Sequence, residues 1–191
     1  MKTKKYSYND LIKILQKLHA PDGCPWDREQ THTSILDNLL EESYEAKAAI
    51  LSGDRDAMVD ELGDCLLQAI FHGFIADRNG SFDTTDIVDN LCRKLISRHT
   101  HIFGDDKATT ADQALAIWQK NKHKSPYESI KNLPVDLPTH IKIKKLNKAL
   151  DKNGVTNPPL QKELATDLHA LQQAQAKVDH TLSQMTELLK T

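Results

Sequence analysis

The chain has 191 residues, of which 39% are hydrophobic and 27% are charged, so it is long enough for a hydrophobic core and has the composition of a folded globular protein. Its formal net charge of −2 provides no global basic field, and we expect no stable binding to nucleic acid. Three scattered cysteines, no recognisable secretory leader and no apolar run of about 20 residues predict neither a disulfide framework nor a membrane span, and we expect a cytoplasmic protein.

Hydrophobic periodicity predicts helices through most of the first 80 residues, because apolar residues recur at helical spacing and the alternating pattern of strands is lacking. The first helix spans residues 8–19, and a loop rich in proline and glycine follows at residues 20–27. The second helix spans residues 33–51. Gly53 stands just beyond it, where a left-handed glycine ends many helices, and the third helix spans residues 55–78.

The rest of the chain is also predicted to be helical. An acidic first turn favours a helix at residues 83–99, and a threonine cap, Thr109 or Thr110, favours one at residues 110–122. Apolar residues spaced by three, four and seven predict a long amphipathic helix from about residue 158. We therefore expect an all-α protein in three parts: a helical domain at residues 1–123, a proline-containing linker and helix at residues 124–157, and a C-terminal amphipathic helix at residues 158–191.

Two pairs of carboxylates lie on the second and third predicted helices. Glu42 and Glu45 are three residues apart, and Glu61 and Asp64 repeat that spacing, so each pair shares one helix face. The short connection predicts antiparallel neighbours, which lets the two pairs face each other at similar heights. Carboxylates gathered in one cleft repel one another unless a cation is present. Oxygen ligands with room left for water and phosphate suit Mg²⁺, and also Mn²⁺.

A simpler interpretation is that these acids form a solvated helix face, as most glutamate clusters do. The pair Glu42 and Glu45 alone favours that interpretation. Glu61 and Asp64, however, interrupt an otherwise apolar helix, where unpaired acids are unfavourable. The spacing by itself leaves the metal site and the solvated face both open.

Further sequence blocks accompany the acids. Residues 23–32 read Gly-Cys-Pro-Trp-Asp-Arg-Glu-Gln-Thr-His, and residues 94–104 read Lys-Leu-Ile-Ser-Arg-His-Thr-His-Ile-Phe-Gly. Trp118 is followed four residues later by Lys122. With the acids and the block at residues 60–72, these sequences resemble the motifs of the MazG-type nucleoside triphosphate pyrophosphohydrolases, over about residues 8–155.

The resemblance implies an all-α helix bundle that is completed by dimerisation, so we expect a homodimer or a higher homo-oligomer. It also implies metal-dependent hydrolysis of a nucleoside triphosphate, NTP or dNTP, to the monophosphate and pyrophosphate, as in house-cleaning of the nucleotide pool. Carried over by position, the metal ligands are Glu42, Glu45, Glu61 and Asp64, and the candidate general bases are Glu41 and Glu45. The implied substrate contacts are Trp26, Lys94, Arg98, Trp118 and Lys122.

Two residues depart from the family pattern, and other functions stay open. Ser97 stands where the family often has a second arginine, which bears on phosphate binding. Thr100 stands where it has proline, which relaxes the chain after the fourth predicted helix. The alternatives are a related all-α pyrophosphohydrolase of narrower substrate, dUTPase-like or specific for phosphoribosyl-ATP, and a non-catalytic helical module that binds a partner. Trp26 either stacks on a base or anchors its loop.

Overall fold

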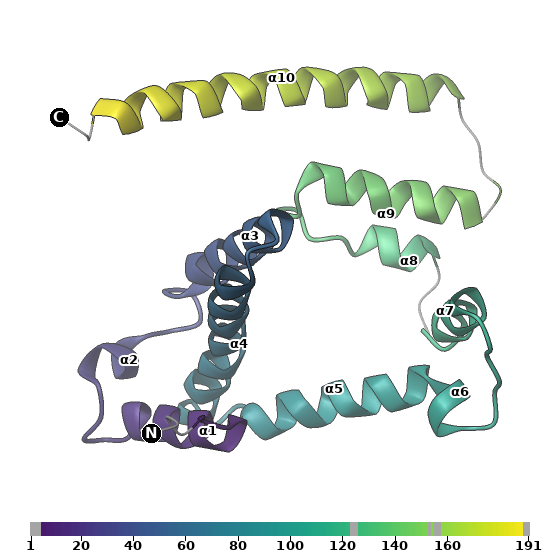
Figure 1. Ribbon diagram of the computed structural model, residues 1–191. Helices are drawn as coiled ribbons and strands as arrows, with labels where there is room; N and C mark the ends of the chain where they lie inside the picture. The colour runs from purple at the N-terminus through teal and green to yellow at the C-terminus, as the bar shows by residue number, and fades with distance from the viewer. Residues whose placement is uncertain (1–4, 123–125, 153, 155–157, 189–191) are drawn as a thin grey trace. The chain divides into compact units, whose positions relative to one another are not determined.

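The computed structural model describes residues 5–122, 126–152, 154 and 158–188, and within these ranges every regular element is a helix, as predicted (Figure 1). The chain forms two compact units, residues 1–122 and 123–191. The predicted domain boundary at residue 123 lies outside the described residues. None of the described helices is both long and apolar enough to cross a membrane.

The first unit contains α1 (Tyr8–His19), α2 (Pro25–Glu29), α3 (Leu36–Ser52), α4 (Arg55–Arg78), α5 (Thr84–Arg98), α6 (Thr100–Phe103) and α7 (Ala111–Lys120). The second contains α8 (Pro126–Lys131), α9 (Thr139–Lys152) and α10 (Pro158–Leu188).

The hairpin of α3 and α4 is the most extensive packing in the first unit. Gly53 makes the turn with a φ of 73°, a conformation that side chains with a Cβ rarely adopt. The Asp54 carboxylate then caps α4 by accepting hydrogen bonds from the backbone N–H groups of Asp56 and Ala57. The buried residues of α3 are Ala46 and Ala49, whose small side chains permit a close approach of the two helices. The turn and the cap together fix the height at which the two helices face each other.

A small apolar core lies where the start of α3 meets the C-terminal half of α4. It consists of Ile35, Phe71 and Ile75, with Leu67 packed against it. Helix α1 adds its buried Leu15 and packs on α4.

Helix α5 starts beside α4 and leads away from the hairpin towards α6 and α7 (Figure 1). The close approach depends on Gly73, because a Cβ there would lie 2.5 Å from Cγ2 of Thr84. Asp83 and Asp86 form a capping box at the start of α5. At the start of α7, Thr110 rather than Thr109 is the cap, and its hydroxyl accepts from the backbone N–H of Gln113. These capping hydrogen bonds explain why the predicted limits of α5 and α7 are close to the observed ones.

Short helices replace irregular chain at two places where we predicted none. Residues 25–29 form α2, which begins inside the predicted loop and ends two residues beyond it, with Pro25 at its first turn, where a proline needs no hydrogen bond. Residues 126–131 form α8 inside the predicted linker. In addition, α3 begins at Leu36 rather than residue 33, because Thr31 and Ser34 exchange side-chain to backbone hydrogen bonds that hold a turn.

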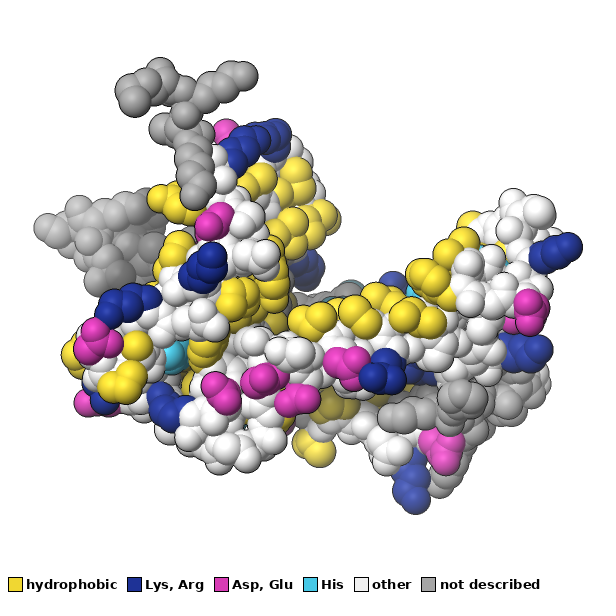
Figure 2. Space-filling view, turned by 90° about the horizontal axis from the view of Figure 1, so that it is seen from below, with side chains coloured by type: hydrophobic (Ala, Val, Ile, Leu, Met, Phe, Trp, Pro, Cys, Tyr) yellow, Lys and Arg dark blue, Asp and Glu magenta, His cyan; other side chains and the backbone are white. Residues whose placement is uncertain are grey.

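Many apolar side chains of the first unit are exposed in a single chain. Figure 2 shows them in a stripe along α5. The stripe contains Val88, Leu91 and Leu95, at the spacing of one helix face. Helix α4 exposes a comparable set: Val59, Leu62 and Leu66. On α3 the exposed apolar residues are Leu36, Leu40, Tyr44, Ile50 and Leu51. Apolar surface spread over three helices is more than an isolated soluble unit ordinarily leaves in water.

Candidate metal centre

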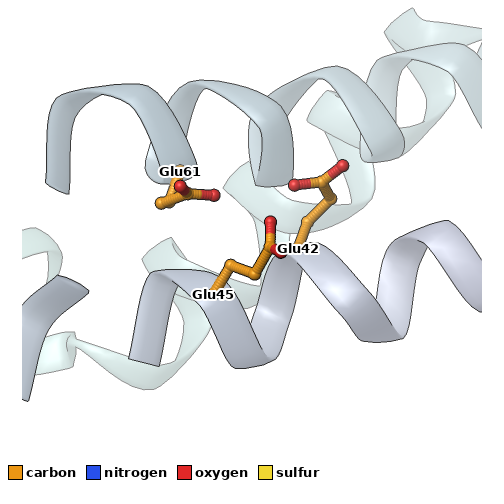
Figure 3. A group of neighbouring side chains, drawn as sticks. All are labelled: Glu42, Glu45 and Glu61. Carbon is orange, nitrogen blue, oxygen red and sulfur yellow. The ribbon is translucent and has the colours of Figure 1, made fainter. Parts of the chain in front are cut away.

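Three of the four predicted metal ligands meet across the hairpin. Glu42 and Glu45 project from α3 towards α4, and Glu61 lies on the facing side of α4 (Figure 3). One carboxylate oxygen from each lies within 4.8 Å of the others. Glu42 and Glu61 are half-buried, and Glu45 is exposed. Two side chains from one helix and one from its antiparallel neighbour thus form an oxygen-only cluster that opens to solvent.

The donor set fits a divalent cation. Mg²⁺ binds oxygen at about 2.0–2.1 Å, so opposite ligands lie about 4.2 Å apart. The oxygen–oxygen separations of up to 4.8 Å exceed that distance by about 0.6 Å at most, and glutamate side chains can close such a gap by rotating. Three carboxylates without nitrogen or sulfur donors match the preference of Mg²⁺ or Mn²⁺. The three carboxylates therefore have the donor chemistry of a divalent-cation site, and their spacing lies close to what such a site needs.

The acids raise one another's proton affinity. The pKa of Glu42 is raised above 4.5, first by partial burial and then by the negative charges of Asp64, Glu45 and Glu41. The pKa of Glu61 is also raised, first by partial burial and then by the charge of Glu45. A bound cation would favour the ionised form of each carboxylate and so offset the mutual repulsion that raises these pKa values.

The remaining two predicted acids lie beside this cluster but outside it. Asp64 is half-buried one turn beyond Glu61 on α4, and its charge acts on Glu42, yet it is not part of the compact group of three. Glu41 is exposed on α3 and also contributes to the raised pKa of Glu42. The cluster therefore consists of three glutamates, and Asp64 and Glu41 lie close enough for their charges to act on Glu42.

A hydrogen bond that the sequence did not reveal joins the two acid-bearing helices. The thiol of Cys65 on α4 donates to the backbone carbonyl of Glu42 on α3, with 3.4 Å between sulfur and oxygen. Cys65 adjoins Asp64 in the chain, so this contact sits at the cluster itself. The sequence could not predict this hydrogen bond, because the hydrophobic pattern at position 65 is equally compatible with any small residue.

A second cluster gathers three of the predicted substrate contacts around one aromatic ring. The guanidinium carbon of Arg98, the last residue of α5, lies 5.2 Å from the ring centroid of Trp118 on α7. The ammonium nitrogen of Lys122 lies 5.6 Å from the same centroid. Two cations on one indole form a positive and aromatic surface that suits a nucleotide or its phosphates.

The two family departures lie next to this second cluster. The Thr100 hydroxyl donates to the Asp106 carboxylate and accepts a 2.8 Å hydrogen bond from the side-chain amide of Asn121, which joins the start of α6 to the end of α7. The Ser97 hydroxyl donates to the backbone carbonyl of Lys94, so it is occupied within its own helix. Thr100 thus supplies a tether that proline cannot form, which corrects our expectation of a relaxed chain at this point.

The two clusters are separate in one chain. Lys94 is exposed on α5, one turn before Arg98. Among the ion pairs that the described residues form, none joins Lys94 or Arg98 to the acids of α3 and α4. The predicted cationic and acidic halves are therefore each assembled, but the described residues of a single chain do not bring them into contact.

Trp26 lies on α2, which the chain clamps to α4. Its ring meets Phe71 at 6.3 Å between centroids in an edge-on arrangement, while 56% of the residue stays exposed. The guanidinium of Arg78 donates to the backbone carbonyls of Arg28 and Gln30 at the end of α2. The tryptophan is thus anchored on one edge and open on the rest, so the geometry accommodates both roles that we considered for it.

Histidines complete this clamp, and sequence reasoning missed their pairing. The Nδ1 atoms of His32 and His72 lie 2.8 Å apart, so one ring donates to the other. The pKa of His72 is lowered by burial and by the neighbouring His32. His19 stacks on Phe74, and burial lowers its pKa as well. Among the described residues, the Nδ1 of His72 has a partner, whereas its Nε2 is buried without one.

Comparisons with known proteins show which family and which relatives the chain resembles. Residues 30–103 match the family described as the MazG nucleotide pyrophosphohydrolase domain. The chain is 42% identical over 127 residues to a nucleoside triphosphate pyrophosphohydrolase/pyrophosphatase MazG of Thermotoga maritima, covering 65% of this chain and 50% of that protein. It is 38% identical over 144 residues to a nucleoside triphosphate pyrophosphohydrolase of Escherichia coli K12, covering 72% of this chain and 55% of that one. An uncharacterised protein of Bacillus subtilis, YabN, is 37% identical over 147 residues, which are 75% of this chain and 30% of the relative. The chain thus spans about half the length, or less, of these curated relatives.

Proposed function

We propose that this chain hydrolyses nucleoside triphosphates, NTPs or dNTPs, to the monophosphate and pyrophosphate, and the match of residues 30–103 to the MazG nucleotide pyrophosphohydrolase domain supports this proposal. Names of relatives at 38–42% identity support that activity. The observation that carries the proposal is the cluster of Glu42, Glu45 and Glu61, whose carboxylate oxygens lie within 4.8 Å of one another. The proposed biological role is the removal of unwanted nucleotides from the pool.

In this proposal the three glutamates, with Asp64 beside them, hold Mg²⁺ or Mn²⁺. When bound, the ion supplies positive charge to the phosphate oxygens and lowers the pKa of a coordinated water. Hydrolysis consumes one water and breaks the anhydride bond between the α- and β-phosphates, so a carboxylate must accept a proton. Glu41 beside the cluster and Glu45 within it are the candidates, because both side chains are exposed and therefore accessible to water.

The second cluster binds the nucleotide. Arg98 and Lys122 meet the charge of the phosphates, and Lys94 extends that charge by one turn along α5. Trp118 offers an aromatic face to the base. Trp26 contributes from α2, with its exposed ring available for stacking.

A homodimer, or a higher homo-oligomer, is part of the proposal. The exposed apolar faces of α3, α4 and α5 support it, because a second copy can cover them with the same residues. The separation of the acidic and cationic clusters within one chain also supports it, since a second copy can present the missing half.

The experiment is a pyrophosphate-release screen over canonical and modified NTPs and dNTPs, with and without Mg²⁺ or Mn²⁺. Metal-dependent release of pyrophosphate and the monophosphate from several triphosphates is the expected result. Release confined to dUTP or to phosphoribosyl-ATP would replace the proposal by one of the narrower activities. No release from any triphosphate would overturn it and favour the non-catalytic module.

A further inference from the structure

Helix α10 is a long helix that neither α8 nor α9 covers within the described residues of the second unit. It spans 31 residues, Pro158–Leu188, about 46 Å at 1.5 Å per residue. Wherever the exposure of its side chains is described, they are exposed, with Leu164 the exception at intermediate exposure. Neither α8 nor α9 packs along it among the described residues. An isolated helix gains little stability from its own hydrogen bonds, so a helix of this length ordinarily depends on packing against another surface.

The apolar residues of α10 follow a heptad repeat. Leu164, Leu171, Val178 and Met185 recur every seven residues and occupy the d positions. The a positions are 168, 175, 182 and 189, of which three are leucine in the sequence and one is Gln175. The described apolar residues of this seam from position 171 onward are 48–59% exposed. Alternation of three and four residues sustained over four heptads is the pattern of a coiled coil rather than of a helix packed on a globular core.

Gln175 and the flanking charges indicate what covers the seam. Gln175 donates a 2.8 Å hydrogen bond to Asp179 one turn ahead, which leaves its carbonyl oxygen and second amide hydrogen for another partner. In a parallel pair of identical helices, Gln175 meets Gln175 of the second copy, and each amide finds a matching donor and acceptor. In an antiparallel pair it would face an apolar d residue and remain unpaired.

The charge pattern beside the seam is compatible with the same parallel pairing. The positions next to the seam carry two acidic residues among the described side chains, Asp167 and Asp179. In parallel register Asp167 faces Gln172 of the second copy, and Asp179 faces Ala174 of the second copy. No like charges are therefore brought together across the pair.

We propose that α10 is a homotypic pairing helix, which forms a parallel, in-register, two-stranded coiled coil with α10 of a second copy through the seam of Leu164, Leu171, Val178, Leu182 and Met185. This interface is distinct from the apolar faces of α3, α4 and α5. Its function is to join copies of the chain through the second unit, and it is independent of whether the first unit hydrolyses nucleotides.

Disulfide trapping in the full-length chain tests the proposal. In a parallel pair, Val178 faces Val178 of the second copy, so Val178→Cys should give a disulfide-linked dimer on mild oxidation. His180→Cys, two residues away on the outer face, is the matched control and should stay at the level of the unmodified chain, whose three native cysteines set the baseline. Equal trapping at both positions, or none at Val178→Cys, would overturn the proposal.

A second comparison tests whether disulfide trapping depends on the apolar seam or only on two helices lying near each other. Adding Leu171→Lys to the Val178→Cys chain places two ammonium groups in the seam and should lower trapping at least tenfold. Adding Gln173→Lys places the same charge on the outer face and should leave trapping unchanged. If Leu171→Lys has no effect, the seam is not the interface. Because the readout is trapping rather than pyrophosphate release, failure here is distinguishable from failure of the proposed enzymatic activity.

Discussion

The thiol of Cys65 donates a hydrogen bond to the backbone carbonyl of Glu42, and this contact joins α4 to α3 at the level of the acidic cluster. A shift of one helix past the other by a single turn would separate Glu61 from Glu42 and Glu45. The contact thus links the packing of the hairpin to the geometry of the candidate metal site.

Replacing Glu42 is expected to stabilise the metal-free protein while abolishing its response to metal. Its raised pKa means that the ionised carboxylate is less favourable in the folded chain than in the unfolded one at neutral pH. In Glu42→Gln, the metal-free Tm at pH 7.5 should therefore rise by up to a few degrees, and the increase that Mg²⁺ produces in the unmodified chain should disappear. Differential scanning fluorimetry with EDTA or Mg²⁺ measures both. A metal-free Tm below that of the unmodified chain would contradict the account of the cluster.

The same groups give the metal-free protein a defined pH response. Because the folded pKa values of Glu42 and Glu61 lie above 4.5, the folded state binds more protons than the unfolded state between 4.5 and the raised values. Their contribution to stability consequently increases as the pH falls through this window, and Mg²⁺ affinity decreases as the carboxylates become protonated. Calorimetric titration of Mg²⁺ at pH 7.5 and pH 5.5 should show weaker binding at the lower pH. Equal affinity at both values would contradict this expectation.

The half-buried histidines His19 and His72 give the stability a pH dependence of the opposite sign, at higher pH. Folding lowers the pKa values of His19 and His72 below 6.5, so the unfolded state takes up protons first as the pH falls. Stability from these groups is complete above pH 6.5 and is lost as the pH falls through the folded pKa values. Urea unfolding followed by the fluorescence of the two tryptophans, both in the first unit, should show a decrease from pH 7.5 to pH 5.5. His72→Gln should flatten that decrease, whereas the exposed His180→Gln should not.

Trp118 is expected to contribute to nucleotide binding rather than to the chemical step. Loss of the indole removes the ring that Arg98 and Lys122 both approach, and stacking or cation–π contacts of this kind contribute about 1–2 kcal/mol. Trp118→Leu should raise KM by roughly tenfold with little change in kcat. Trp118→Phe keeps an aromatic face, so its KM should lie between that of the unmodified chain and that of Trp118→Leu. Steady-state kinetics of pyrophosphate release would contradict this assignment if kcat fell and KM did not change.

Arg78 is expected to hold α2 in place. Its guanidinium bridges the backbone carbonyls of Arg28 and Gln30, and because the side chain is largely exposed, its removal should cost about 1 kcal/mol. Lysine cannot reproduce the bridge with one ammonium group, so Arg78→Lys and Arg78→Met should both shift urea unfolding in the same direction. Trp26 fluorescence should move to longer wavelength in both. A shift with methionine alone would indicate that charge, not the bridge, is what matters.

The hairpin and its acids were predictable from the sequence because local chemistry determines them. Gly53 and Asp54 end one helix and begin the next, and the spacing of three places each acid pair on one face. The proximity of Arg98 to Trp118 was implied only by family resemblance, because it depends on the turn at α6 rather than on any periodicity.

Other features depend on tertiary contacts that no local pattern records. Helix α2 has five residues, too few to be stable alone, and Arg78, fifty residues away from Arg28, holds it. The pairing of His32 with His72 likewise joins distant segments. Asp64 shares the predicted face, yet it lies outside the compact group, because equal spacing along a helix does not fix side-chain direction.

The most direct test of the central claim compares two neighbouring acids on α4. Glu61 belongs to the acidic cluster, and Asp60, adjacent in sequence and exposed, does not. Pyrophosphate release in Mg²⁺ should fall by at least a hundredfold in Glu61→Gln, with Mg²⁺ binding lost by calorimetry, while Asp60→Asn should retain both within a few-fold. Equal activity and metal binding in Glu61→Gln and Asp60→Asn would contradict the assignment of the cluster as the metal centre of a nucleoside triphosphate pyrophosphohydrolase.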